Sequence, residues 1–100
     1  MTFNEIEEGV KLLNSMDYDK CRNEYHVLFW KMYHTLVKMD ETGEIIKEPD
    51  RKNISYLLEL LEHDGPEYAY TIEFWHRDSE EKRYRIGVCV RGAPILKKVE

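Results

Sequence analysis

The sequence predicts a single α+β domain, residues 1–100, with three helices followed by an antiparallel β-hairpin. Two apolar patterns with helical spacing fill the first forty residues. A third pattern ends at the pair Gly65-Pro66, the usual order of residues at a helix C-terminus. Alternation of apolar and polar residues over 68–90 then predicts two paired strands.

The first predicted helix covers residues 3–16. Thr2-Phe3-Asn4-Glu5 fits a capping box, in which the Thr2 hydroxyl and the Glu5 carboxylate cover free amides of the first turn. The apolar residues that follow have helical spacing and predict one buried face: Ile6, Val10 and Leu13. The segment Asp17-Tyr18-Asp19 breaks this pattern and offers a cap for the next element.

Residues 19–41 are apolar on most of a helical wheel, and two interpretations compete. Glu24, Lys31 and Lys38 recur every seven residues, which favours a helix. The β-branched and aromatic content favours instead a hairpin within residues 33–47, turning at Asp40 to Gly43. We prefer the helix. A helix with so narrow a polar strip either lies at the centre of the fold or uses its second apolar stripe against a partner. This second stripe consists of His26, Phe29, Trp30, Tyr33 and Val37.

Residues 44–50 form a connector, and a short strand is expected at 44–47. Asp50 or Asn53 then caps a third predicted helix, whose apolar residues keep helical spacing up to the Gly65-Pro66 stop. These residues are Ile54, Leu57, Leu58 and Leu61.

The hairpin has a predicted register. With the turn centred near Ser79, Phe74 faces Tyr84 and Ile72 faces Ile86 on the inner side. The same register places Glu73 opposite Arg85 and Trp75 opposite Arg83, an ion pair and a cation–π pair. Because a slip of one residue would destroy both matches, the register is well specified. A further strand is expected within 94–99.

Charge is unevenly distributed along the chain. Residues 1–67 carry 15 acids against 8 bases, and residues 68–100 carry 5 acids against 7 bases, for a net charge of −5. An acidic body argues against duplex DNA as the main partner and favours attraction to a basic protein, although solubility alone also accounts for it. The acidic start and the lack of a long apolar run predict a cytoplasmic protein with no membrane partner.

Nothing in the residue spacings predicts a cofactor, a metal site or catalytic residues. No two of the four histidines stand three or four residues apart, and Cys21 and Cys89 are expected to be free thiols. The segment RNEYH (22–26) is similar to the Arg…His pair of HEPN ribonucleases, but it is one residue shorter than that pattern, so no catalytic role is carried over. A small nuclease stays a second alternative.

The order of helices and hairpin also fits a winged-helix DNA-binding regulator, the first alternative. The third helix would have to read the groove. Its outward residues are predominantly acidic and repel phosphate, which weighs against this interpretation. They are Glu59, Glu62, His63 and Asp64.

The leading hypothesis is a non-enzymatic interaction protein, an acidic inhibitor that blocks a basic nucleic-acid-handling protein. This profile is similar in type, without a shared motif, to phage-encoded anti-defence proteins, anti-CRISPR proteins among them, and to toxin-immunity proteins. Carboxylates would stand where phosphates bind, and aromatic residues would add specificity; a homodimer stays open. The predicted interface residues are Trp30, Tyr33, His34, Asp40, Glu41, Glu44, Glu48, Asp50 and Trp75.

Overall fold

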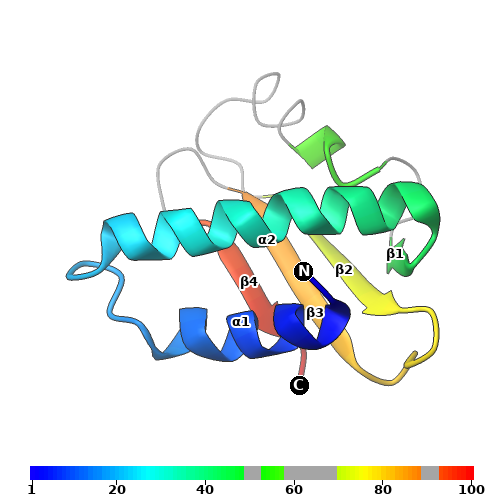
Figure 1. The fold of residues 1–100 in the computed structure, drawn as a ribbon, viewed down its shortest axis with the longest axis horizontal. Coiled ribbons are helices and arrows are strands. Elements are labelled where there is room, and N and C mark those ends of the chain that lie inside the picture. The colour runs from blue at the N-terminus through cyan, green and yellow to red at the C-terminus, as the bar shows by residue number, and fades with distance from the viewer. Residues whose placement is uncertain (49–52, 58–69, 89–92) are drawn as a thin grey trace.

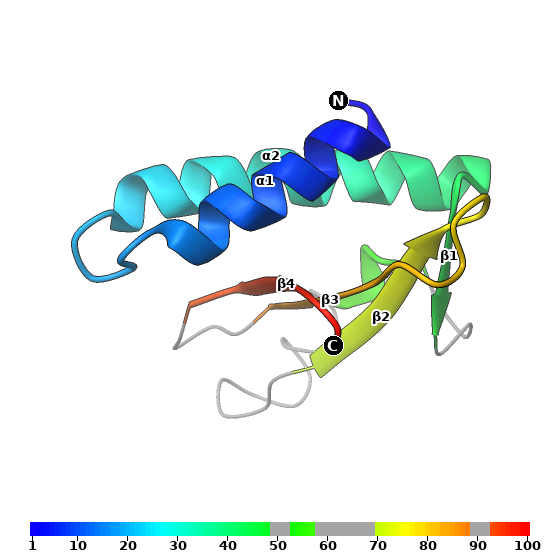
Figure 2. The same ribbon diagram turned by 90° about the horizontal axis from the view of Figure 1, so that it is seen from below.

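The computed structural model describes residues 1–48, 53–57, 70–88 and 93–100. These residues form two layers, two helices on one face of a four-stranded antiparallel sheet (Figures 1 and 2). The helices are α1 (Phe3–Ser15) and α2 (Arg22–Thr42). The strands are β1 (Ile45–Glu48), β2 (Tyr70–His76), β3 (Arg83–Val88) and β4 (Ile95–Lys98), in the order β1-β2-β3-β4. The α+β class is therefore confirmed, with two helices in the described residues instead of three.

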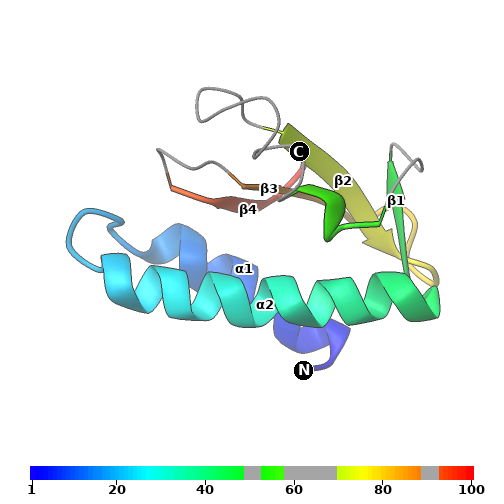
Figure 3. The same cartoon turned by 90° about the horizontal axis from the view of Figure 1, so that it is seen from above.

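The predicted third helix falls largely outside the described residues. Of its predicted span the structure describes 53–57, where Ile54 and Leu57 are buried. This short segment lies beside α2, and the Tyr33 hydroxyl donates a hydrogen bond to the Ile54 carbonyl at 3.3 Å (Figure 3). Asp50 lies outside the described residues.

The predicted capping box of α1 is present. The Glu5 N–H donates to the Thr2 hydroxyl at 3.2 Å, and the Thr2 N–H donates to the Glu5 carboxylate at 3.0 Å. These hydrogen bonds from Thr2 lower the pKa of the Glu5 carboxyl. Gly9 lets α1 approach α2, because a Cβ built there would lie 2.6 Å from the Met32 sulfur.

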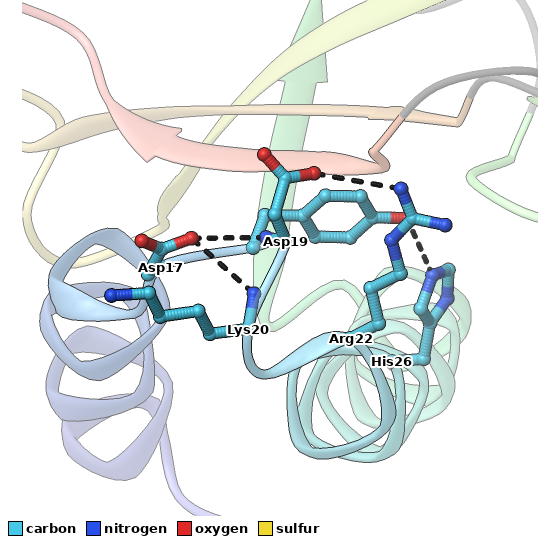
Figure 4. Close-up of polar contacts among 6 residues, drawn as sticks. Asp17, Asp19, Lys20, Arg22 and His26 are labelled. Atoms are coloured by element: carbon cyan, nitrogen blue, oxygen red, sulfur yellow. Dashed lines mark hydrogen bonds and ion pairs between the residues drawn. The ribbon is translucent and has the colours of Figure 1, made fainter.

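The helical interpretation of residues 19–41 is confirmed. The helix ends at Gly43, whose φ of 77° is the left-handed conformation typical of a C-terminal cap. The expected cap from Asp17 or Asp19 is wrong: the N-cap of α2 is Cys21, without a side-chain hydrogen bond. The Asp17 carboxylate instead accepts the N–H groups of Asp19 and Lys20 in the loop (Figure 4).

The predicted hairpin register is confirmed at all four pairs, including Glu73 opposite Arg85 and Trp75 opposite Arg83. Both expected extra strands are also present, as β1 and β4. β2 and β3 are thus the inner strands of the four-stranded sheet in the described residues.

The core lies between the helices and the sheet. Its fully buried side chains come from α1, α2, β2, β3 and β4 and include Ile6, Leu13, Phe29, Met32, Leu36, Phe74, Ile86 and Leu96. The hydroxyls of two buried tyrosines link elements of the core by hydrogen bonds, one from α2 to the segment before β4 and one from β3 to α1. Tyr25 donates to the Pro94 carbonyl at 2.6 Å, and Tyr84 donates to the Glu7 carboxylate at 2.8 Å. Burial, followed by the bond to Glu7, raises the pKa of Tyr84 well above its ordinary value.

Candidate functional site

The face of the sheet that points away from the helices is formed by alternate residues of each strand. On β1 the outward residue Ile46 is 44% exposed, whereas its neighbour Ile45 is buried in the core. Ile46 is paired directly with Trp75 of β2, and the Arg83 guanidinium lies over the Trp75 ring at 4.2 Å. One row across three strands is therefore an exposed isoleucine, a half-buried tryptophan and an arginine that covers it.

Acidic side chains lie next to this row. Glu48, at the end of β1, is 66% exposed and forms an ion pair with Arg83 at 3.2 Å. Glu73 binds Arg85 at 2.8 Å and lies 3.9 Å from Arg83. The Glu48–Arg83 pair is exposed on its Glu48 side, and such pairs contribute about 0–1 kcal/mol each. A partner can therefore replace this pair at little cost in stability, whereas the Glu73–Arg85 pair is part-buried.

The other end of β1 also carries exposed carboxylates. Glu41 is exposed in the last turn of α2, and Glu44 is about one third exposed at the start of β1. The Glu44 carboxylate lies 3.6 Å from His76 Nε2. His76 Nδ1 accepts the Asp78 N–H at 3.1 Å, and this bond orients the ring.

We call this set the β1 edge surface: Glu41, Glu44, Ile46, Glu48 and Trp75. Ile46, Trp75 and Glu48 lie on the outer face of the sheet. Glu44 lies beside His76 at the start of β1, and Glu41 lies in the last turn of α2. Four of its five members are predicted interface residues. Sequence reasoning missed Ile46. Neighbouring residues of a strand point to opposite faces, so of the two adjacent isoleucines, Ile45 and Ile46, only one could face the core. This alternation was the signal that could have predicted an exposed isoleucine here.

The structure does not bring the other predicted residues to this surface. Trp30 is half-buried on α2, with its ring edge-on to Phe29 and Tyr33 at 5.2 Å from each. Tyr33 is buried, and burial raises the pKa of its hydroxyl to about 12. His34 is exposed on α2 beside these rings. The second apolar stripe of α2 thus packs, around Tyr33, against residues 53–57 of the same chain.

Asp40 is an internal residue, although we predicted it as a surface carboxylate. Its side chain is 4% exposed and forms an ion pair with Lys47 of β1 at 3.0 Å. Its second oxygen accepts the Ile54 N–H at 2.7 Å. Asp40 therefore joins α2, β1 and the segment 53–57, and a charge so placed is not available to a partner.

The loop between α1 and α2 holds a second polar cluster (Figure 4). The Tyr18 hydroxyl and His26 Nε2 share a hydrogen bond of 2.8 Å, and the Arg22 guanidinium lies 5.5 Å from the Tyr18 ring centre. Arg22 also pairs with Asp19 at 3.5 Å. Arg22 and His26 of the RNEYH segment therefore contact the loop from the first turns of α2.

The described residues hold no metal-binding cluster and no membrane-spanning helix. In the part of the chain with assigned positions, no three His, Cys, Asp or Glu side chains are placed to hold a metal ion. Neither α1 nor α2 has the length and apolar character needed to cross a membrane. Cys21 is a half-buried free thiol, and Cys89 lies outside the described residues.

Comparison of the chain with protein-family models, with curated proteins and with solved structures found no match.

Proposed function

We propose that the protein is a non-enzymatic acidic inhibitor that binds a basic, nucleic-acid-handling protein through the β1 edge surface. The observation that carries the proposal is the exposed Ile46, opposite Trp75, with exposed Glu48 at one end of its strand and Glu41 and the partly exposed Glu44 near the other. Protein interfaces have this anatomy, with an apolar and aromatic centre and a polar rim.

Charge complementarity indicates the class of partner. Glu41 and Glu44 at one end and Glu48 at the other present carboxylates to a cationic surface, where they replace phosphate oxygens. The net charge of −5 strengthens attraction to such a surface at a distance, and salt weakens it. Ile46 and Trp75 then supply contacts that a phosphate backbone does not.

The position of β1 adds a second means of recognition. It is an edge strand of the sheet, so the backbone groups on its outer side have no neighbouring strand among the described residues. A partner segment can pair with such an edge, and the side chains beside it then set the specificity. A second copy of this chain is the competing occupant of the same edge.

The test is capture of a partner from the cell that produces the protein, with a charge-neutral variant and a matched control. The variant Glu41→Gln/Glu44→Gln/Glu48→Gln removes three charges from the proposed surface. The control Glu8→Gln/Asp19→Asn/Glu24→Gln removes three exposed charges elsewhere.

We expect wild type and control to capture the same basic protein, more weakly as salt rises, and to block its binding of nucleic acid. The first variant should lose both effects. Equal capture by all three proteins would contradict the proposal. So would direct binding of an oligonucleotide duplex by the wild-type chain at low salt, or self-association that the glutamate substitutions abolish while no other protein is captured.

A further inference from the structure

A second site is suggested by a groove at the opposite edge of the sheet, along β4. The groove has a volume of about 590 Å³, within the range of small-molecule sites. Four basic side chains line it: Lys11 of α1, Arg85 of β3, and Lys97 and Lys98 of β4. One acid, Glu100, lines it as well. An excess of positive charge in one hollow is unexpected in a chain of net charge −5.

This arrangement carries an electrostatic cost within the sheet. Arg85 and Lys97 are directly opposite each other on β3 and β4, and like charges in this position are destabilising. Glu73 compensates Arg85 at 2.8 Å. No carboxylate in the described part of the chain forms an ion pair with Lys97 or Lys98. Lys11 pairs with Glu8 at 3.3 Å, but both side chains are about three quarters exposed, so the pair is weak.

Lysines on an edge strand also prevent strands of other molecules from pairing there. That role explains Lys97 and Lys98, which belong to the edge strand. It does not explain why Lys11 of the helix and Arg85 of the inner strand line the same groove. Basic residues from three elements border this one groove, and positive charge is what an anionic ligand requires.

The backbone of β4 supplies a further donor. The Val99 N–H bonds the Arg83 carbonyl at 3.0 Å, so the N–H of Lys98, one residue earlier, points away from β3 to the open edge. At Leu96 the outward-pointing carbonyl of this edge already accepts a hydrogen bond from the Asn14 side chain at 3.3 Å. A further β-strand pairing with β4 would need that carbonyl as an acceptor. A compact anion needs only the hydrogen-bond donors at Lys98.

We propose that this groove binds two or three linked phosphate groups, as free polyphosphate or as part of a nucleotide. The Lys98 ammonium and N–H donate hydrogen bonds to phosphate oxygens on the side of β4 that faces the helices, where Lys11 adds positive charge. Lys97 and Arg85, whose side chains point to the other face of the sheet, add positive charge from across the edge. The site is independent of the β1 edge surface and of the function proposed for it.

The experiment is titration of the full chain with inorganic tripolyphosphate, and separately with ATP, followed by amide NMR shifts and calorimetry. We expect saturable shifts at Asn14 and at residues 97–100. Lys97→Gln/Lys98→Gln should weaken binding at least about tenfold, since each lost charge-assisted bond is strong. The control Lys31→Gln/Lys38→Gln removes two exposed charges of α2 that do not line the groove, and it should leave the affinity within about twofold.

The two ligands distinguish the source of the phosphates. Equal affinities indicate recognition of the phosphate chain alone, and tighter binding of ATP indicates a nucleotide. The proposal is overturned if neither compound gives saturable shifts, or if both lysine pairs contribute equally. It is also overturned if a single-stranded oligonucleotide shifts the same amides at lower concentration than either compound.

Discussion

Replacing Asp40 tests whether this carboxylate is structural. In Asp40→Ala, the Ile54 N–H loses the acceptor at 2.7 Å and Lys47 loses the carboxylate at 3.0 Å. Both ion-pair side chains are nearly buried, at 4% and 11% exposure. Removing one partner of a buried ion pair costs about 3–5 kcal/mol, and we expect about 3 kcal/mol here because Lys47 keeps some contact with solvent. For a domain of this length that loss lowers Tm by about 12–24 °C.

The assay is thermal and urea unfolding followed by circular dichroism, with two matched variants. Asp40→Asn keeps an oxygen acceptor for the Ile54 N–H and removes the charge, so we expect a loss of about 1–2 kcal/mol. Glu41→Ala changes the adjacent exposed carboxylate and should stay within about 0.5 kcal/mol of wild type. If Asp40→Ala were as stable as Glu41→Ala, Asp40 would not hold α2, β1 and the segment 53–57 together.

Three further predictions concern the core. Gly9→Ala should destabilise the protein by about 1 kcal/mol in urea unfolding. The new Cβ would overlap the buried Met32 side chain, and the cost of this overlap should outweigh the gain in helix propensity. In a Met32→Ala background the same change should become neutral or favourable. Tyr25→Phe should cost about 1–2 kcal/mol, because the Pro94 carbonyl loses its buried donor, and an unchanged urea midpoint would disprove the bond's contribution. The pKa of Tyr33 is raised from 10.0 to about 12 by burial, so the stability it contributes is complete below pH 10 and is lost as the pH rises to about 12. Tyrosinate absorbance against pH, compared with Tyr33→Phe, measures this, and ionisation of Tyr33 near pH 10 in the folded protein would contradict it.

Local signals in the sequence were sufficient for much of the fold. The capping box at Thr2 and Glu5 needs residues three apart, and the hairpin register needs matching residues on two neighbouring strands. Both are properties of short segments, and both were predicted correctly. The position of the hairpin inside a four-stranded sheet depends on β4, which follows β3 closely, and on β1, which pairs with β2 from a more distant part of the chain. Short strands of four residues carry little pattern of their own.

The candidate site shows the same limit. The exposure of Glu48 and the acidic character of the β1 region could be predicted from composition. The burial of Asp40 could not, because it depends on Lys47 and on the Ile54 N–H, seven and fourteen residues away. The burial of Tyr33 likewise depends on where the segment 53–57 lies. On a helix that is apolar around most of its circumference, tertiary contacts decide which side chains are exposed. The periodicity of the sequence carries no information about those contacts.

The most direct test of the binding surface is site-specific photo-crosslinking inside the cell that produces the protein. A photoreactive residue is placed at Ile46, in the centre of the β1 edge surface, or at Val27, which is 71% exposed on α2, the helix layer on the other face of the sheet. We predict a discrete crosslink to a basic nucleic-acid-handling protein from position 46, lost when Glu48→Lys is added, and no such product from position 27. The same crosslinked proteins from both positions, or none from position 46, would contradict binding through β1.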